Sequence, residues 1–149
     1  VFDPNIRPHV MSDREKYVAV VEKWVSISSV VKLSDDDCEW LYPGQSAESI
    51  AARWLQGGVA LVVVTRGADG LVGYTSDGVV EVGGQKVSVV DTVGAGDAFV
   101  GALCAEIARG VDIQRAAQIA SIAGALATTI RGAVPSLPQR AAVMSLYAD

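Results

Sequence analysis

The hydrophobic pattern of the first half of the chain changes its period several times. Tyr17, Val21 and Val25 recur at helical spacing behind a polar stretch, 12–15, whose residues have the spacing of a capping box. Further along, 60–64 is an uninterrupted apolar run, which is typical of a strand buried on both faces. The elements predicted for this half are helices at 12–26, 34–42 and 46–56 and strands at 30–33 and 60–64.

In the second half, short valine-rich runs give way to long helical patterns. Asp77-Gly78 and Gly83-Gly84 separate successive apolar runs, and such dipeptides favour hairpins and therefore an antiparallel edge of the sheet. Asp112 is the predicted N-cap of the second long helix. The elements predicted for this half are strands at 71–74, 79–82 and 87–90 and helices at 96–109, 112–130 and 139–147.

The order of these elements indicates the fold class. Strands and helices alternate first and helices dominate later, which favours an α/β layered fold with a mostly parallel sheet. The 149 residues are enough for one domain. Half of them are hydrophobic and only 19% are charged, a composition that excludes an intrinsically disordered chain.

Charge and composition exclude several classes of function. Twelve basic against seventeen acidic residues leave a net charge of −5, so no nucleic-acid partner is expected. Cys38, Cys104 and the single His9 are too few for a disulfide scaffold, a multi-histidine metal site or a histidine-based catalytic triad. The longest uncharged run near the C-terminus, 116–130, is too short and too polar to span a membrane. We therefore expect a cytoplasmic protein without a membrane partner.

The segment Asp91-Thr92-Val93-Gly94-Ala95-Gly96-Asp97 carries the chemistry of the sequence. It lies between a valine-rich strand and a long helix, so its glycines would present backbone N–H groups at a helix N-terminus, where phosphate binds well. A carboxylate repels phosphate, unless it accepts a proton from the group that attacks the phosphate. On residues alone, the alternative is that Asp97 complements the helix dipole and that the glycines only form a turn.

Two better-known phosphate-binding loops do not match this segment. A dinucleotide-binding fingerprint would place its third glycine at position 99, which is Phe99. A Walker A loop needs a Gly-Lys-Ser/Thr sequence, and none follows. The segment is therefore neither a dinucleotide-binding fingerprint nor a Walker A loop.

The stretch 91–102 resembles the C-terminal signature of the ribokinase-like (PfkB) carbohydrate kinases. Three further segments are similar to motifs of that family, in the same order along the chain. They are Asp3-Pro4-Asn5-Ile6-Arg7-Pro8, Thr65-Arg66-Gly67-Ala68-Asp69-Gly70 and Ile130-Arg131-Gly132-Ala133-Val134-Pro135-Ser136. The resemblance implies a three-layer ribokinase-like sandwich with a mostly parallel sheet and an antiparallel edge. Residues 1–149 would be the C-terminal nucleotide-binding and catalytic part of that single domain.

The resemblance also implies roles for individual residues. Asp97 matches the general base that deprotonates the sugar hydroxyl, and Gly94, Ala95 and Gly96 match the anion hole. The residues implied in nucleotide binding are Thr65, Arg66, Gly67, Gly70, Ser121 and Gly124. Small residues also allow close helix packing, so this alternative stays open for Ser121 and Gly124. Asn5 and Arg7 would contact the substrate together with Asp97.

Metal ions enter through the same resemblance. The family's Asn-x-x-Glu motif aligns with 34–37, so that Asp37 would help to organise Mg²⁺ indirectly, and a capped helix with an acidic first turn explains the same residues. Many members also bind a monovalent cation, which makes K⁺ a candidate cofactor. Its ligands would come from Asp91, Val93, Ala127, Ile130, Gly132 and Ser136.

The implied activity is the ATP-dependent phosphorylation of a sugar hydroxyl. The Lys-x-Ser-Asp-x-Asp stretch at 32–37 is similar to one in bacterial fructokinases, so fructose is the expected substrate, with 2-keto-3-deoxygluconate or ribose as alternatives. The family places most sugar contacts and the lid in an N-terminal half that is absent here. The missing half is thus an expected partner, a homodimer is a candidate assembly, and an inactive nucleotide-binding fragment is the remaining alternative.

Overall fold

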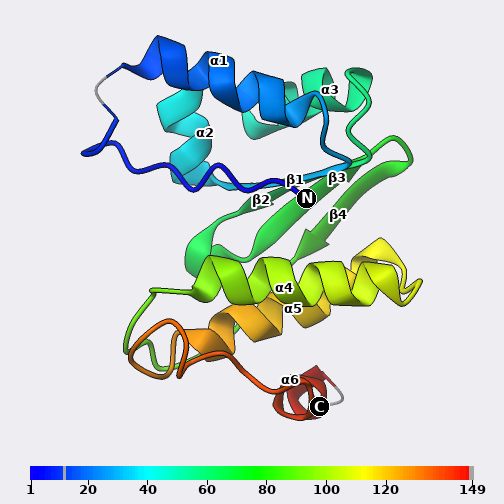
Figure 1. Cartoon of the computed structure of the whole chain (residues 1–149). Coiled ribbons are helices and arrows are strands. Elements are labelled where there is room, and N and C mark those ends of the chain that lie inside the picture. The colour runs from blue at the N-terminus through cyan, green and yellow to red at the C-terminus, as the bar shows by residue number, and fades with distance from the viewer. Residues whose placement is uncertain (12, 148–149) are drawn as a thin grey trace. The chain divides into compact units, whose positions relative to one another are not determined.

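The computed structural model describes residues 1–11 and 13–147 (Figure 1). Its helices and strands confirm an α/β fold. The chain divides into two compact units. Unit 1 comprises 1–67 and 71–80, and unit 2 comprises 68–70 and the chain from Glu81 onward.

A mixed four-stranded sheet runs through unit 1 in the order β1-β2-β3-β4. The strands are β1 (Val30–Ser34), β2 (Leu61–Thr65), β3 (Leu71–Thr75) and β4 (Gly78–Val82). β1 and β2 are parallel, with Val31 opposite Val62, whereas β2 and β3 are antiparallel. The antiparallel edge is therefore confirmed, and parallel pairing among the described residues is limited to β1–β2 and a short bridge between Phe2 and Val31.

The helices of unit 1 begin at polar capping residues. They are α1 (Arg14–Val25), α2 (Asp35–Leu41) and α3 (Ala47–Gln56). Ser34 and Ser46 cap α2 and α3 as predicted, because each side chain accepts a backbone N–H of the first turn. The cap of α1 is Asp13, which accepts from the Lys16 N–H, whereas Ser12 of the predicted capping box lies outside the described residues.

The core of unit 1 lies between the sheet and these helices. Val31, Leu33 and Val62 are fully buried on β1 and β2, and Ile50 of α3 belongs to the same cluster. Strands buried on both faces have apolar side chains throughout, as the 60–64 run indicated. The exception is Lys32, which is buried in the middle of β1.

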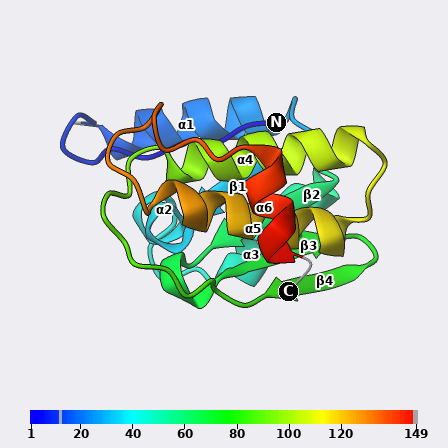
Figure 2. The same cartoon turned by 90° about the horizontal axis from the view of Figure 1, so that it is seen from below.

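Unit 2 is built on three helices, of which α4 and α5 pack against each other (Figure 2). They are α4 (Ala95–Ala108), α5 (Ile113–Ala127) and α6 (Arg140–Tyr147), and a 3₁₀ turn, η1 (Gly67–Asp69), lies at the junction of the units. α6 contributes Val143 to a small cluster with Ile119 and Ile122 of α5. Among the described residues, no helix is long and apolar enough to cross a membrane.

In unit 2, one predicted strand is wrong and one predicted helix ends earlier than expected. The segment 87–90 forms no strand, because the Val90 N–H donates to the Thr128 carbonyl at the end of α5 (2.8 Å) instead of to a neighbouring strand. Val90 is also 57% exposed, unlike a residue of a buried strand. α5 ends at Ala127 rather than near Ile130, since the Thr128 N–H turns back to the Ala125 carbonyl.

Candidate active site

The predicted site residues are distributed over both units. Unit 1 holds Asn5, Arg7, Asp37, Thr65, Arg66 and Gly67. Unit 2 holds Gly70, Asp91, Val93, Gly94, Ala95, Gly96, Asp97, Ser121, Gly124, Ala127, Ile130, Gly132 and Ser136.

In unit 2, Asp91 joins the signature segment to the segment 130–136. One carboxylate oxygen, Oδ1, accepts the Val93 N–H (3.0 Å), and Oδ2 accepts the Gly132 N–H (2.9 Å). These two donors lower the pKa of Asp91 below its ordinary value. The structure thus brings together Asp91, Val93 and Gly132, three of the residues predicted to surround a monovalent cation.

The turn before α4 requires glycine at position 94. Gly94 has a φ of +87°, which L-residues with a side chain rarely adopt. A Cβ atom there would also lie 3.0 Å from the Cα of Ala133. From the sequence, Ala133 has no predicted role, although it belongs to the Gly-Ala-x-Pro motif; in the structure it lies against Gly94.

The N-terminus of α4 presents several backbone donors. Gly94 is its N-cap and has no side chain to accept them. The Ala95 N–H donates to the Thr92 carbonyl (3.2 Å), whereas the N–H groups of Gly94, Gly96 and Asp97 have no acceptor among the described residues. Unpaired donors at the positive end of a 14-residue helix are suited to bind an anion.

Asp97 lies in the first turn of α4, next to these donors. Its side chain is exposed, and no described residue donates a hydrogen bond to it or forms an ion pair with it. An aspartate that only complements the helix dipole needs no ligand. A carboxylate without a partner among the described residues is, however, also free to accept a proton from a substrate.

The remaining predicted residues of unit 2 lie on α5 and in the segment 130–136. A Cβ at Gly124 would lie 3.3 Å from the Ala95 carbonyl oxygen, so the packing alternative is supported for Gly124 on α5. Ser121 is half-buried on the same helix. Ser136 is buried and its hydroxyl donates to the Ala133 carbonyl (3.1 Å), Ala127 is buried, and Ile130 is exposed.

The predicted nucleotide turn is packed backbone against backbone. Within unit 2, a Cβ at Gly70 would lie 2.0 Å from the Val82 carbonyl oxygen, and one at Gly84 would lie 1.7 Å from that of Ala68. Gly84 was interpreted from sequence only as part of a hairpin signal. The doubled glycine was the available clue to this close approach, because glycine often marks a place where another backbone lies near.

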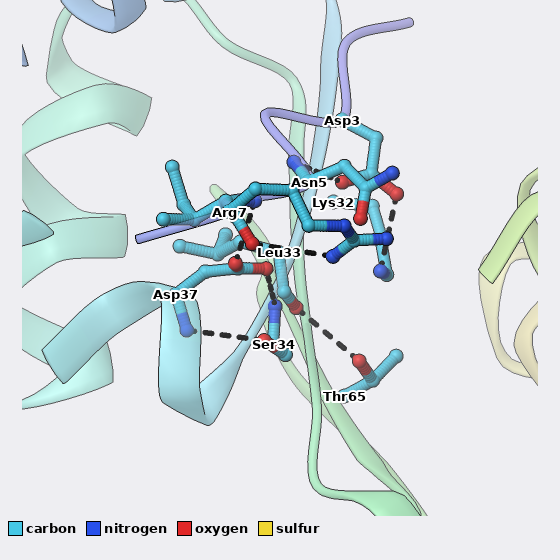
Figure 3. Close-up of polar contacts among 9 residues, drawn as sticks. Asp3, Asn5, Arg7, Lys32, Leu33, Ser34, Asp37 and Thr65 are labelled. Carbon is cyan, nitrogen blue, oxygen red and sulfur yellow. Dashed lines mark hydrogen bonds and ion pairs between the residues drawn. The ribbon is translucent and has the colours of Figure 1, made fainter. Parts of the chain in front are cut away.

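In unit 1, a polar cluster lies along the second half of β1 and at the end of β2 (Figure 3). Lys32 Nζ forms an ion pair with Asp3 Oδ2 (3.1 Å), and the Thr65 hydroxyl donates to the Leu33 carbonyl (3.4 Å). The carboxyl ends of parallel strands are where α/β folds bind ligands. The sequence pattern does not predict that Lys32 belongs to this cluster, although a lone lysine in the apolar run 30–33 is a visible signal.

The N-terminal segment of this cluster carries Asn5 and Arg7. Asn5 has a φ of +43°, and its N–H donates to Asp3 Oδ1 (3.0 Å). Arg7 is exposed, and among the described residues its side chain donates to the Ile6 carbonyl alone (Nη1, 3.2 Å). Its guanidinium therefore retains donors for an anionic or polyhydroxylated ligand. Arg66, after β2, is also exposed.

Asp37 accepts hydrogen bonds from two separate backbone segments. It completes a capping box with Ser34, whose N–H donates to Asp37 Oδ2 (2.9 Å), so the capped-helix interpretation is confirmed. Its other oxygen, Oδ1, accepts the Ile6 N–H (3.0 Å). No group of three or more His, Cys, Asp and Glu side chains in the described part of the chain can hold a metal ion.

Residues 1–140 match the family model described as pfkB family carbohydrate kinase. The chain belongs to this family. It is 43% identical over 105 residues to a fructokinase of Rhizobium leguminosarum bv. trifolii, covering 70% of the chain and 32% of that protein. It is 41% identical over 147 residues to a fructokinase of Vibrio alginolyticus, covering 92% of the chain and 47% of that protein. The chain therefore spans a third to a half of the length of these two relatives.

Solved structures agree with this assignment. A double mutant of Vibrio cholerae O395 fructokinase, in a form with bound fructose, ADP and potassium ion, has a TM-score of 0.86 and 37% identity, and covers 97% of the chain and 48% of that structure. An Escherichia coli structure with ATP and Mg²⁺, provisionally assigned as a ribokinase II, has a TM-score of 0.90 and 31% identity, and covers 99% and 47%. The predicted ribokinase-like fold is confirmed.

Proposed function

We propose that this chain is part of an enzyme that phosphorylates a sugar hydroxyl with ATP, and that the sugar is fructose. The observation that carries the proposal is the start of α4, where unpaired N–H groups lie beside the unpaired carboxylate of Asp97. An anion site next to a proton acceptor is the set of parts that phosphoryl transfer needs. The choice of fructose rests on the two fructokinase relatives and the fructose-bound neighbour.

In the proposed reaction, Asp97 accepts the proton of the sugar hydroxyl. The hydroxyl oxygen bonds to the γ-phosphorus of ATP while the bond from that phosphorus to the β–γ bridging oxygen breaks, and ADP leaves. The N–H groups of Gly94, Gly96 and Asp97, at the positive end of α4, stabilise the charge on the transferred phosphoryl group. The turn formed by Thr65, Gly67 and Gly70 is the proposed contact of the nucleotide.

Two cations belong to the proposal. Mg²⁺ would neutralise phosphate charge when bound with ATP, as in the neighbour that holds both, and this fits a chain whose described residues form no metal cluster of their own. A monovalent cation would supply positive charge beside the anion site. The bonds of Asp91 to Val93 and Gly132 support such a site, because they place two predicted ligand segments together.

The proposed partners are the sugar and the remainder of a longer enzyme, acting in the cytoplasm. The test is ATP-dependent phosphorylation by the full-length protein of a panel with fructose, 2-keto-3-deoxygluconate and ribose. We expect the highest kcat/KM for fructose. A preference for either of the other sugars would assign the enzyme to the corresponding kinase, and binding of ATP with no turnover on any sugar would refute the proposed sugar-kinase activity.

Asp97→Asn in the full-length protein tests the base. Loss of a general base typically lowers the rate by about 10²–10⁴-fold, so we expect kcat to fall by about 10²-fold or more. The affinity for ATP should stay within a few-fold of the parent value. Asp36→Asn is the matched control, because Asp36 is also an exposed aspartate in the first turn of a helix. Equal activities of the two variants would refute the assignment of Asp97.

A further inference from the structure

The segment 3–7 has no regular secondary structure, yet it is held at three points in unit 1. Lys32 Nζ pairs with Asp3 Oδ2 at 3.1 Å, and both side chains are mostly buried. The Tyr17 hydroxyl of α1 donates to the Pro4 carbonyl (3.1 Å). Irregular backbone that is fixed from several sides is suited to present side chains in one geometry.

The third point is Asp37, and it is the most buried of the three. Its Oδ1 accepts the Ile6 N–H (3.0 Å) across 31 residues of sequence, while Oδ2 stays on the Ser34 N–H (2.9 Å). Asp37 as a whole is 7% exposed, and Ile6 is 5% exposed in the core of the unit. One carboxylate thus ties the start of α2 to the residue between Asn5 and Arg7.

The consequence for Asn5 and Arg7 is geometric. Asn5 is the one non-glycine residue with positive φ among the described residues, and such a conformation persists only when its surroundings hold it. Release of the Ile6 N–H would free both the left-handed backbone of Asn5 and the root of the Arg7 side chain. The exposed tip of Arg7, in contrast, has only the Ile6 carbonyl to orient it.

We propose that Asp37 is a positioning residue: it serves the active site by fixing the segment that carries Asn5 and Arg7, and not by organising Mg²⁺. This inference rests on the proposed function for its kinetic consequence, but its structural part stands independently. Both Asp37 oxygens are directed at backbone N–H groups (Figure 3). A glutamate at this position would place its oxygens one methylene further along, which changes both bonds.

The structural arm of the test is amide hydrogen exchange in the full-length protein, which does not depend on catalysis. Asp37→Asn leaves one neutral amide oxygen for two N–H groups, so the Ile6 N–H either loses its acceptor or keeps a weaker one, and we expect its exchange to accelerate about tenfold or more. Asp36→Asn is the control, since Asp36 is exposed on the same turn and bonds no segment outside it. Unchanged protection of the Ile6 amide in Asp37→Asn would overturn the proposal.

The kinetic arm separates positioning from a role toward Mg²⁺. For Asp37→Asn we expect the KM for the sugar to rise about tenfold, with the Mg²⁺ concentration for half-maximal activity unchanged. Adding Arg7→Ala should then cost less than Arg7→Ala costs in the parent enzyme, because the two residues act through one segment. A shifted Mg²⁺ requirement at constant sugar KM, or full additivity with Arg7→Ala, would overturn it.

Tyr17→Phe keeps the test decisive if Asp37→Asn does not fold. This variant removes only the bond to the Pro4 carbonyl and retains the packing of the ring against Trp40. We expect it to raise sugar KM and Ile6 exchange in the same direction by a few-fold, at unchanged Mg²⁺ requirement. If the parent enzyme phosphorylates no sugar at all, the proposed function fails while the exchange data still decide the role of Asp37.

Discussion

Glu106 of α4 accepts two hydrogen bonds from Arg140 of α6, at 3.1 Å from Nε and 3.3 Å from Nη2. The glutamate side chain is only 3% exposed, whereas the arginine is 52% exposed. A buried carboxylate depends on its partners, because it has lost most of its water. The Glu106–Arg140 pair therefore attaches α6 to the rest of unit 2.

Loss of this arginine should destabilise the protein. We expect Arg140→Met to lower the free energy of unfolding by about 1–3 kcal/mol, since both charged hydrogen bonds are lost and Glu106 stays buried. Arg109→Met is the control, because Arg109 gives Glu106 a single bond of 3.3 Å and lies at the C-cap of α4, not on α6. Urea unfolding of both variants decides: an equal or larger loss in Arg109→Met would contradict the attachment of α6 by Arg140.

Gly94 should not tolerate a side chain. Gly94→Ala places a Cβ at a φ of +87° and 3.0 Å from Ala133 Cα, and the left-handed backbone alone costs about 1–2 kcal/mol. In α4 itself, Gly101→Ala meets no atom within 4 Å and should raise stability by about 0.5–1 kcal/mol. Thermal unfolding of the pair should therefore shift in opposite directions, and a shift in the same direction would refute the Gly94–Ala133 contact.

A neighbouring pair of glycines offers a sharper comparison. Gly84→Ala would push a Cβ to 1.7 Å from the Ala68 carbonyl oxygen, so the turn at 65–70, the proposed contact of the nucleotide, has to move, at a cost of about 1–3 kcal/mol. Gly83→Ala meets nothing within 4 Å. We expect calorimetric titration with ATP to show weaker binding for Gly84→Ala than for Gly83→Ala. Identical ATP affinities of the two variants would refute the proposed contact between this turn and the nucleotide.

Asp91 should make stability depend on pH. The Val93 and Gly132 N–H donors lower its pKa below the ordinary value of 3.8, so its contribution is complete above that value and is lost as the pH falls through the lowered pKa. Asp91→Asn should therefore lower the free energy of unfolding at pH 7. The difference in this free energy between the variant and the parent should become smaller below about pH 4. Unfolding curves of both proteins from about pH 7 to about pH 3 measure this free-energy difference. A difference that stays constant over this range would contradict the prediction.

The two cysteines should react at different rates. Burial, followed by the charges of Asp37 and Asp35, raises the pKa of the Cys38 thiol to about 12. Alkylation needs the thiolate, so Cys38 should be almost inert at pH 8, whereas the half-buried Cys104 should react first. Mass spectrometry of Cys38→Ala and Cys104→Ala after iodoacetamide treatment reads each site alone. Faster labelling at Cys38 would reject this order.

The parts of the fold that sequence predicted are those governed by local chemistry. Ser34, Ser46 and Asp112 each accept an N–H three residues ahead, and a local pattern of this kind is visible in the sequence. The segment 87–90 has the composition of a strand but forms none, because a strand also needs a partner that composition does not reveal.

The candidate site shows the same division. The resemblance identified the glycine turn, and the structure supplied the partners of its residues, such as Ala133 against Gly94. The Ser34–Asp37 capping box was predictable because its members are three residues apart. The bond from Ile6 to Asp37 spans 31 residues and joins an irregular segment to the first turn of α2, so no periodicity or motif in one sequence could have predicted it.

The start of α4 differs from the starts of four other helices in one respect. α1, α2, α3 and α5 each begin with an aspartate or serine whose oxygen satisfies a backbone donor, whereas α4 begins at a glycine that offers none. Such an oxygen is typically worth about 1 kcal/mol to a helix. On the proposed function, a phosphate oxygen would take that place, so the substrate completes the helix that activates it. The first turn of α4 would then be most stable while ATP is bound, and it would lose part of that stability each time ADP leaves.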